Sequence, residues 1–406
     1  LTLGQDISDR VVQLTGKPPQ FSLGKSFDTY GPIGPAIVSV DQFADPDDIG
    51  LWCDVGTEGS LEPIARREGC LTVVPGLIRA VRPWHDGLAL LRLTRLFRER
   101  RPDVVHTHSG KAGILGRLAA RRAGVPIIVH GIHGPSFGPF QGALSNAVFT
   151  TAERYAGRMT THFVSVADAM TRQYLAAGIG HPEQYTRVFS GFNLTPFLTA
   201  RRNPDLAARL GLAPDDFVVG KIARLFELKG HDDLFAAAPE LIRRIPRIRF
   251  LLVGDGPWRQ RFEAMASEPP LRGHFVFSGL VPPSSVAEHV ALMDCLVHLS
   301  RREGLPRALP QALAGGRPVV AFDCDGAGEV CRDDETGFLL APGDTAGLVD
   351  RLALLAGDPA LRVRLGETGR SWVSDRFSVE RLVNDQHALY LRLAADRSQR
   401  DGGIPS

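Results

Sequence analysis

A short segment in the second half of the chain combines residue types that can bind anions and hydroxyl groups. Glu303 precedes a tight turn, Gly304-Leu305-Pro306, and Gln311 follows eight positions after Glu303 in a predicted helix. The backbone N–H groups of such a turn are free at a helix N-terminus, where phosphates and sugar hydroxyls can be bound. Because the two side chains are about two helical turns apart, both can face one cleft. Taken alone, the segment fits an ordinary strand–loop–helix connection equally well.

Two basic residues and a glycine-rich turn precede this segment. Arg224 follows a predicted strand at 218–223, and Lys229 comes five residues later. An arginine can bind two phosphate oxygens at once and a lysine adds a point charge, so this pair suits a diphosphate. The next predicted strand ends in a turn with Gly254 and Gly256, which permits close approach of the backbone to a nucleotide. A solvated basic loop and an ordinary strand end are the alternative interpretations.

Histidine residues follow two predicted strands in the first half of the chain. His108 ends one strand and is followed by Lys111, and His133 comes directly after the next strand. A single histidine is more often structural, but several at neighbouring strand ends predict a site. Glu329 lies in a second glycine-rich turn of the other half, where an acid is equally expected from the charge of a helix N-terminus.

Strands and helices alternate from about residue 60 onward, which predicts two doubly wound parallel sheets with ligands at the carboxyl ends of their strands. Residues 193–214 are predicted to link the two domains, and 379–395 form an amphipathic helix before a disordered tail. The predicted strands are 71–74, 104–108, 127–130, 162–166 and 187–190 in the first domain, and 218–223, 248–253, 274–278, 295–299, 319–323 and 337–340 in the second.

Composition argues against several classes of protein. The chain has 406 residues, 44% of them hydrophobic, which is enough for two or three domain cores. Its net charge of +2 does not indicate nucleic-acid binding. Five scattered cysteines without a C-x-x-C pair predict reduced thiols and no zinc site. No apolar run reaches the ~18–20 residues that span a bilayer and no signal peptide opens the chain, so a cytoplasmic location is expected.

Arg224, Lys229, the Gly254–Pro257 turn and the Glu303–Pro306 segment follow one another in a fixed order on successive strands. From about residue 57 to 395 the chain resembles the retaining glycosyltransferases of family 4, which have the GT-B fold. The resemblance implies two Rossmann-like domains that face a cleft. It also implies transfer of a sugar from a nucleotide-diphospho-sugar to a glycan or lipid-linked acceptor, with retention of configuration. No metal is required, because arginine and lysine can replace a divalent cation on the leaving diphosphate.

The resemblance implies roles for single residues. Glu303 contacts the transferred sugar, and Gln311 stands where the family has a second glutamate that binds the nucleotide ribose. Because an amide can both donate hydrogen bonds to ribose hydroxyls and accept them, binding of the sugar donor is expected to be weakened rather than abolished. His133 matches the active-site histidine beside the sugar, and His108 and Lys111 line the acceptor side. The implied catalytic residues are His133 and Glu303, and the implied donor-binding residues are Arg224, Lys229, Gly254, Gly256, Gly304, Leu305, Pro306, Gln311 and Glu329.

Residues 2–55 resemble an internal fragment of the fumarylacetoacetate hydrolase family instead. Asp6 matches a divalent-metal ligand of that family and Lys25 an active-site lysine, but the two glutamate ligands that precede them in the family are absent. One carboxylate cannot hold Mg²⁺ unaided, so hydrolase activity is not expected from this fragment. The fragment replaces the first strand and the Gly-Gly loop of the glycosyltransferase fold, and 38–42 or 50–54 are candidate replacement strands.

The main interpretation is a glycosyltransferase whose activity the atypical N-terminus can impair. The alternatives are a truncated metal-dependent hydrolase or isomerase of the fumarylacetoacetate hydrolase type and a non-catalytic nucleotide-binding protein. Nine basic residues from Arg92 to Arg122 fit peripheral contact with the inner face of a membrane, and a solvated helix face explains them equally well. The predicted domains are 1–55 (hydrolase-like), 56–195 (acceptor side), 196–378 (nucleotide-sugar binding), 379–395 (C-terminal helix) and 396–406 (tail).

Overall fold

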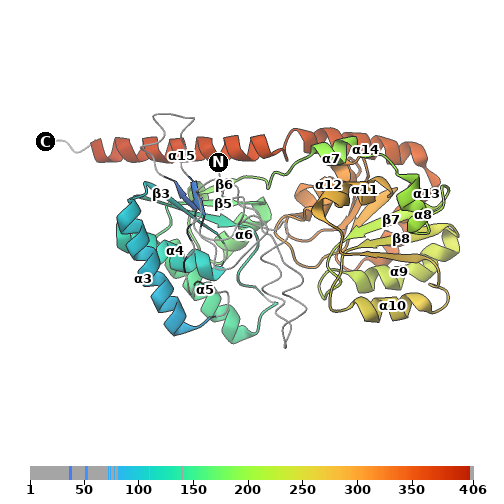
Figure 1. Ribbon diagram of the computed structural model, residues 1–406, viewed down its shortest axis with the longest axis horizontal. Helices are drawn as coiled ribbons and strands as arrows, with labels where there is room; N and C mark the ends of the chain where they lie inside the picture. The colour runs from blue at the N-terminus through green and yellow to red at the C-terminus, as the bar shows by residue number, and fades with distance from the viewer. Residues whose placement is uncertain are drawn as a thin grey trace. The chain divides into compact units, whose positions relative to one another are not determined.

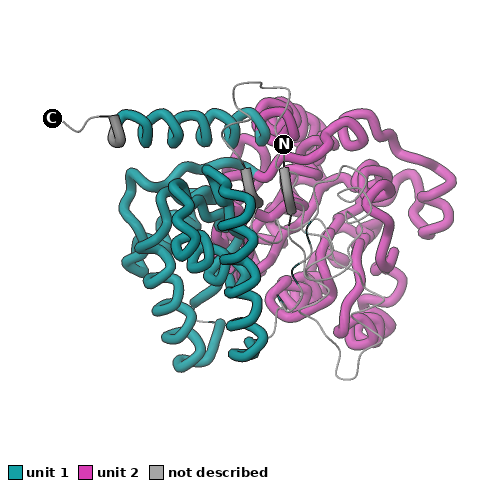
Figure 2. The backbone as a smooth tube through the Cα atoms, turned by 60° about the vertical axis from the view of Figure 1, so that its left-hand side comes forward, with its two compact units in different colours: residues 1–189, 382–406 teal, residues 190–381 magenta. Residues whose placement is uncertain are grey.

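The computed structural model describes residues 36–38, 51–53, 72, 74, 77, 81–108, 110–138 and 140–402, and for 36–38, 51–53 and 400–402 it describes only the backbone. The hydrolase-like residues Asp6 and Lys25 and most of the strand predicted at 71–74 lie outside the described residues. The chain forms two compact units, Leu1–Phe189 with Leu382–Ser406 and Ser190–Arg381 (Figure 2). They are named unit 1 and unit 2.

Unit 1 is built on a sheet whose described strands have the order β2-β1-β3-β4-β5-β6. Strands β3 to β6 run parallel, which confirms the predicted parallel sheet. The last of them was predicted at 187–190 and lies slightly earlier. The parallel strands are β3 (Val104–His108), β4 (Ile127–Ile132), β5 (His162–Ser165) and β6 (Tyr185–Arg187), and the helices around them are α3 (Pro83–Arg100), α4 (Gly110–Ala123), α5 (Ala143–Gly157) and α6 (Asp168–Ala176) (Figure 1).

The edge of β3 is covered by two short strands from the atypical N-terminal segment. Strand β1 (Ala36–Val38) pairs with β3 in the antiparallel direction, and β2 (Leu51–Cys53) pairs with β1. Both lie close to the segments predicted as replacement strands. The backbone groups of β3 that face this side therefore have partners, as buried backbone groups require. The direction of β1 departs from the parallel sheet that the sequence predicted.

The two faces of the unit 1 sheet are covered by helices from different parts of the chain. On one face, Val105 packs in a cluster with Leu93 and Phe97 of α3. On the other, Val104 packs with Leu389 of α15 (Val379–Gly402), the C-terminal helix. This helix extends beyond its predicted end at 395, so residues 396–402 are helical and not disordered as expected. None of the described helices is long and apolar enough to cross a membrane.

Unit 2 is a doubly wound sheet with the strand order β12-β11-β10-β7-β8-β9, and all its ladders are parallel. The observed strands agree with the predicted ones to within one residue at each end. They are β7 (Phe217–Ile222), β8 (Ile248–Val253), β9 (Phe275–Gly279), β10 (Cys295–His298), β11 (Val319–Phe322) and β12 (Gly337–Leu340). From β7 the chain moves toward β8, and from β10 it moves toward β11, so the strand order reverses between β7 and β10. Ligands bind at such a switch point in open α/β sheets.

Helices surround the unit 2 sheet, and the segment predicted as a linker contains two of them, α7 (Thr195–Thr199) and α8 (Pro204–Arg209). The others are α9 (His231–Arg244), α10 (Arg259–Ser267), α11 (Val286–Ala291), α12 (Ala308–Ala314), α13 (Thr345–Gly357) and α14 (Pro359–Ser374).

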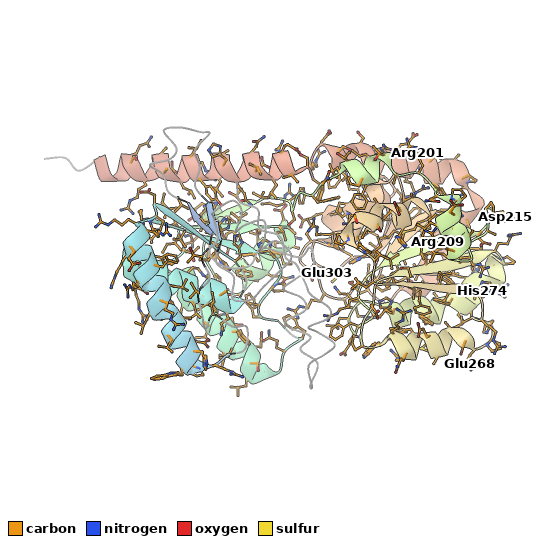
Figure 3. All side chains as sticks on the ribbon, viewed as in Figure 1. Arg201, Arg209, Asp215, Glu268, His274 and Glu303 are labelled. Carbon is orange, nitrogen blue, oxygen red and sulfur yellow. The ribbon has the colours of Figure 1, made fainter. Side chains whose placement is uncertain are left out.

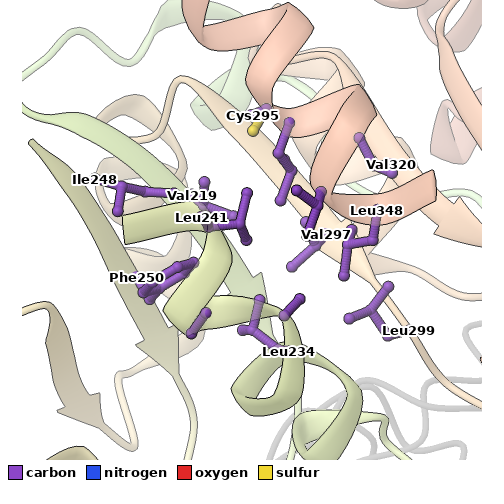
Figure 4. Packing of buried hydrophobic residues seen from close by; sticks show 14 of the residues in the cluster. Val219, Leu234, Leu241, Ile248, Phe250, Cys295, Val297, Leu299, Val320 and Leu348 are labelled. Carbon is purple, nitrogen blue, oxygen red and sulfur yellow. The ribbon is translucent and has the colours of Figure 1, made fainter. Parts of the chain in front are cut away.

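The main core of unit 2 lies between one face of the sheet and helices α9 and α13. Alternate strand residues such as Val219 and Val297 point to this face, where Leu234 and Leu241 of α9 and Leu348 of α13 meet them (Figure 4). Each fully buried side chain of this size contributes roughly 1.5–3 kcal/mol. The strand ends that carry the candidate site are thus held by a well-packed core.

Candidate functional site

The basic and acidic residues singled out from the sequence meet at the switch point of unit 2. Arg224 and Lys229 follow β7, and Glu303 follows β10, the neighbouring strand. Figure 3 shows Glu303 at the opposite end of unit 2 from Asp215 and His274, which precede β7 and β9. The site therefore lies at the carboxyl ends of the strands, as the fold predicts.

An ion pair between the Lys229 Nζ and the Glu303 Oε1 forms the centre of this site. The Nε2 of His298 lies 3.7 Å from the same carboxylate oxygen. Burial by itself raises the pKa of the Glu303 carboxyl, but attraction to the Lys229 ammonium outweighs it and holds this pKa at about 2. Glu303 is therefore ionised at neutral pH and can accept hydrogen bonds from hydroxyl groups.

The backbone around the pair adopts conformations that are uncommon outside glycine. Leu228, which precedes Lys229, has a φ of 68°, and Asp325 has a φ of 51°. The Oδ2 of Asp325 accepts a hydrogen bond of 2.6 Å from the backbone N–H of Glu303. Gly230 also has a positive φ, and a side chain there would collide with the carbonyl of Leu299. Residues strained in this way cluster at functional sites, where the surrounding structure enforces them.

The predicted glycine-rich turn after β8 packs tightly against the loop that carries Arg224. A side chain on Gly254 would collide with the carbonyl of Ala223, and one on Gly256 with the carbonyl of Leu225. The close approach that these glycines allow is thus to the backbone of the chain itself. The Arg224 guanidinium lies over the ring of Phe226, 4.2 Å from its centroid, so stacking helps to orient it.

The turn at Gly304-Leu305-Pro306 is buried and connects to the second glycine-rich turn. The backbone N–H of Gly326 donates a 3.0 Å hydrogen bond to the carbonyl of Gly304, which brings the turn that contains Glu329 to the site.

One expectation about this segment is wrong. Helix α12 begins at Ala308, so Glu303 lies in the preceding loop and the helical spacing assumed between Glu303 and Gln311 does not apply.

Sequence reasoning missed His298 and Asp325, and it also missed Lys221 on β7. Its side chain is 1% exposed, and its Nζ has no hydrogen-bond partner. Burial and repulsion by Lys229 lower the pKa of the Lys221 ammonium and attraction by Asp233 and Glu303 opposes them, so that this pKa is about 7. A lysine within an otherwise apolar strand was the signal that could have identified it.

In unit 1 the predicted histidines do come together. The Nδ1 of His108 and the Nε2 of His133 share a hydrogen bond of 3.0 Å. Burial lowers the pKa of His133 to about 3, so its imidazole is neutral at pH 7. Across the described residues, no group of histidine, cysteine and carboxylate side chains is arranged to hold a metal ion. This histidine pair can therefore donate or accept hydrogen bonds, but it carries no charge.

The histidine pair is supported from the C-terminal helix. The hydroxyl of Tyr390 lies 2.6 Å from the Nδ1 of His106, whose ring packs against that of His108 with 4.2 Å between centroids. Gly131 lies opposite, and a side chain there would collide with the His108 imidazole. Position 131 therefore requires glycine, because the His108 imidazole occupies the space that a side chain would need.

The nine basic residues from Arg92 to Arg122 divide into two that form largely buried ion pairs with residues of unit 1 and seven that are exposed. Lys111, expected on the acceptor side, forms an ion pair with Asp86. Arg117 was expected in the basic segment but is fully buried and paired with Glu153, with 2.6 Å between Nη2 and Oε2. It therefore cannot form part of a surface patch. The exposed members of the segment are Arg92, Arg95, Arg98, Arg100, Arg101, Arg121 and Arg122.

Comparisons with known proteins decide the family. The model for glycosyl transferases group 1 matches residues 203–372, and that for a glycosyl transferase 4-like domain matches 39–189. The putative glycosyltransferase EpsD of Bacillus subtilis is 30% identical over 298 residues, which cover 71% of this chain and 76% of the relative. The chain is a group 1 glycosyltransferase. The two site regions thus lie in the two parts of a glycosyltransferase that separate family models describe.

Further similarities extend over most of this glycosyltransferase. The UDP-Gal:alpha-D-GlcNAc-diphosphoundecaprenol alpha-1,3-galactosyltransferase of Escherichia coli is 26% identical over 328 residues, covering 80% of the chain and 84% of the relative. The crystal structure of Anabaena Alr3699/HepE in complex with UDP superimposes with a TM-score of 0.71 at 22% identity, covering 84% of this chain and 91% of that one. This structural likeness establishes the GT-B fold.

The N-terminal segment of the glycosyltransferase matches a different family. The model for the C-terminal part of fumarylacetoacetate hydrolase covers residues 1–64, which confirms the resemblance predicted for this segment. It overlaps the glycosyl transferase 4-like match, which begins at residue 39. The overlap includes β2, and β1 lies just before it, in the part that the hydrolase model alone matches. These are the two strands that cover the edge of β3.

Proposed function

We propose that this enzyme transfers a sugar from a nucleotide-diphospho-sugar to an acceptor with retention of configuration, as family 4 enzymes do. The observation that carries the proposal is the Lys229–Glu303 ion pair at the switch point of unit 2, with Arg224 in the same loop as Lys229. Two cations and one ionised carboxylate suit the two halves of such a donor. The cations bind the diphosphate, and the carboxylate accepts hydrogen bonds from sugar hydroxyls.

In unit 2, Arg224 and Lys229 stabilise the negative charge that develops on the departing diphosphate, so no metal ion is required. Glu303 orients the sugar, and Gln311 contacts the ribose. The turns at Gly304 and Glu329 complete the donor site, since a backbone hydrogen bond joins them.

In unit 1, His133 acts beside the transferred sugar, and His108 holds its ring through their hydrogen bond. A neutral imidazole can bind a sugar hydroxyl without opposing the charge of the leaving group. Lys111 contributes to the acceptor side together with its partner Asp86. A glycan or lipid-linked acceptor fits the Escherichia coli relative, whose name gives alpha-D-GlcNAc-diphosphoundecaprenol as the acceptor.

A lipid-linked acceptor brings the enzyme to a membrane surface, and helix α3 is suited to that contact. Arg92, Arg95 and Arg98 are exposed on this helix. Trp84 and Leu91 of the same helix are 78% and 66% exposed. Exposed aromatic and aliphatic side chains next to arginines favour the interface of anionic lipid. We therefore propose that the enzyme acts at the cytoplasmic face of the membrane.

The test of the donor site is titration calorimetry with UDP, GDP and ADP. Wild type should bind at least one of them, and Arg224→Ala should weaken that binding about 10- to 100-fold, as loss of a charge-assisted hydrogen bond predicts. Arg272→Ala is the matched control, because Arg272 lies before β9 at the other end of the sheet. No binding of any of the three nucleotides contradicts the proposal. Binding without sugar transfer would identify a non-catalytic nucleotide-binding protein.

A further inference from the structure

Lys221 is a buried cation with no function in the site as described so far. It lies on β7 two residues after Val219, so both point to the face of the sheet that α9 covers. Apolar residues fill this face elsewhere. An ammonium without a hydrogen-bond partner is costly in such a place, and a methionine would fill the same space at no such cost. A position that tolerates this cost calls for a functional reason.

The charged groups around Lys221 come from three elements. From the loop after β7, Lys229 repels its ammonium, and from α9 and the loop after β10, Asp233 and Glu303 attract it. His231 of α9 and His298 of β10 also face it, and burial lowers the pKa of both imidazoles to about 2 and about 3, so they are neutral.

Both carboxylates near Lys221 already have another cation as their partner. Asp233 accepts a 2.6 Å hydrogen bond from the Nη2 of Arg301, and Glu303 is paired with Lys229. Lys221 is therefore the cation of this group that is left without an ion pair among the described residues.

We propose that Lys221 is a second cation of the donor site. Its positive charge balances the negative charge of Glu303 when Lys229 turns from that carboxylate to the diphosphate of the donor. This inference rests on the proposed function. Binding of a diphosphate draws Lys229 away from Glu303, and a buried carboxylate that loses its cation becomes unfavourable. Attraction by Lys221 keeps Glu303 ionised, so that it still accepts hydrogen bonds from the sugar. Lys221 thus acts through Glu303 as a positioning residue.

The decisive variant is Lys221→Met, studied by thermal unfolding and by calorimetry with the nucleotide that wild type binds. We expect its melting temperature to rise by about 2 °C or more, because a buried unpaired charge is removed. We expect nucleotide affinity to fall at least tenfold. A lysine with a purely structural role would instead lose stability on substitution and leave affinity unchanged. Unchanged affinity overturns the inference whatever the melting temperature, while the proposed function stands if wild type binds nucleotide.

A second measurement uses wild-type protein only and does not depend on the folding of a variant. The chain has five lysines, so the signals of ¹³C-labelled lysine side chains form a simple spectrum. We assign the signal that titrates near neutral pH to Lys221. Saturation with UDP, GDP or ADP should shift the midpoint of this titration to higher pH. Anions that enter the site stabilise the charged form. A midpoint that bound nucleotide does not move overturns the inference.

Discussion

Replacing Glu303 with glutamine removes the anion from the central ion pair and keeps the size of the side chain. Its partner Lys229 is then left largely buried, with a side-chain exposure of 19%. The pKa of Glu303 is lowered from its ordinary value of 4.5 to about 2. At about 1.4 kcal/mol for each tenfold change in the ionisation constant, this difference corresponds to about 3 kcal/mol. Glu303→Gln should therefore lower the free energy of unfolding of unit 2 by about 3 kcal/mol at pH 7.

The pH dependence of this effect has a definite sign. A carboxyl whose pKa is lower in the folded state stabilises the protein above its ordinary pKa, and this contribution is lost as the pH falls toward the folded-state value. The difference between wild type and Glu303→Gln should thus be complete above about pH 5 and should shrink between about pH 4.5 and pH 2. Urea unfolding followed by circular dichroism at several pH values measures it.

Glu240 offers a matched control for this experiment. Hydrogen bonds from Arg243 and Arg244 lower the pKa of its carboxyl to about 2 as well, but the ion pairs lie at the surface of α9. Water screens surface pairs, so Glu240→Gln should unfold almost like wild type. If both variants unfold at the same urea concentration at pH 7, the reasoning about the Glu303 pair is refuted. A loss of stability in Glu303→Gln that stays constant down to pH 3 refutes it too.

Two further predictions concern unit 1. In Gly131→Ala the added methyl group displaces the His108 imidazole, so sugar transfer should fall strongly while calorimetry finds unchanged nucleotide affinity; stability should fall by about 1–3 kcal/mol. Gly87→Ala on α3, where a Cβ meets no atom within 4 Å, is its control, and equal transfer rates in the two variants would show that the histidine pair is not needed. Exposed arginines near a membrane contribute about 1 kcal/mol each, so Arg95→Glu with Arg98→Glu should reduce cosedimentation with anionic phosphatidylglycerol vesicles at least tenfold; wild-type protein that does not sediment with them would exclude the contact.

Much of the fold could be predicted because its signals are local. The parallel strands of unit 2 are short apolar runs bounded by glycine, proline and charged residues, and each was predicted to within one residue. The order of Arg224, Lys229 and Glu303, which follow the ends of two strands, can also be seen in the sequence. In a doubly wound fold, strand ends at the switch point converge, so this order indicates a common site. These properties depend on periodicity and turn chemistry, which neighbouring residues carry.

The antiparallel pairing of β1 with β3 and the support of His106 by Tyr390 depend on contacts between distant parts of the chain. No local pattern indicates such contacts. No local pattern indicates which charged side chains are buried, either. Arg117 belongs to a basic run in the sequence, and only the fold shows that it is paired with Glu153 in the interior.

The sequence by itself identified Arg224, Lys229 and Glu303 as residues that bring charge to the site of unit 2. The tertiary structure decided which charges meet and how strongly they interact. Lys229 and Glu303 are separated by 74 residues and become an ion pair only because β7 and β10 are neighbours. Lys221 is an ordinary lysine in the sequence, and it becomes an unusual cation only when the sheet and α9 exclude water from it. The energy of a charge depends on its solvent and its neighbours, and folding supplies both.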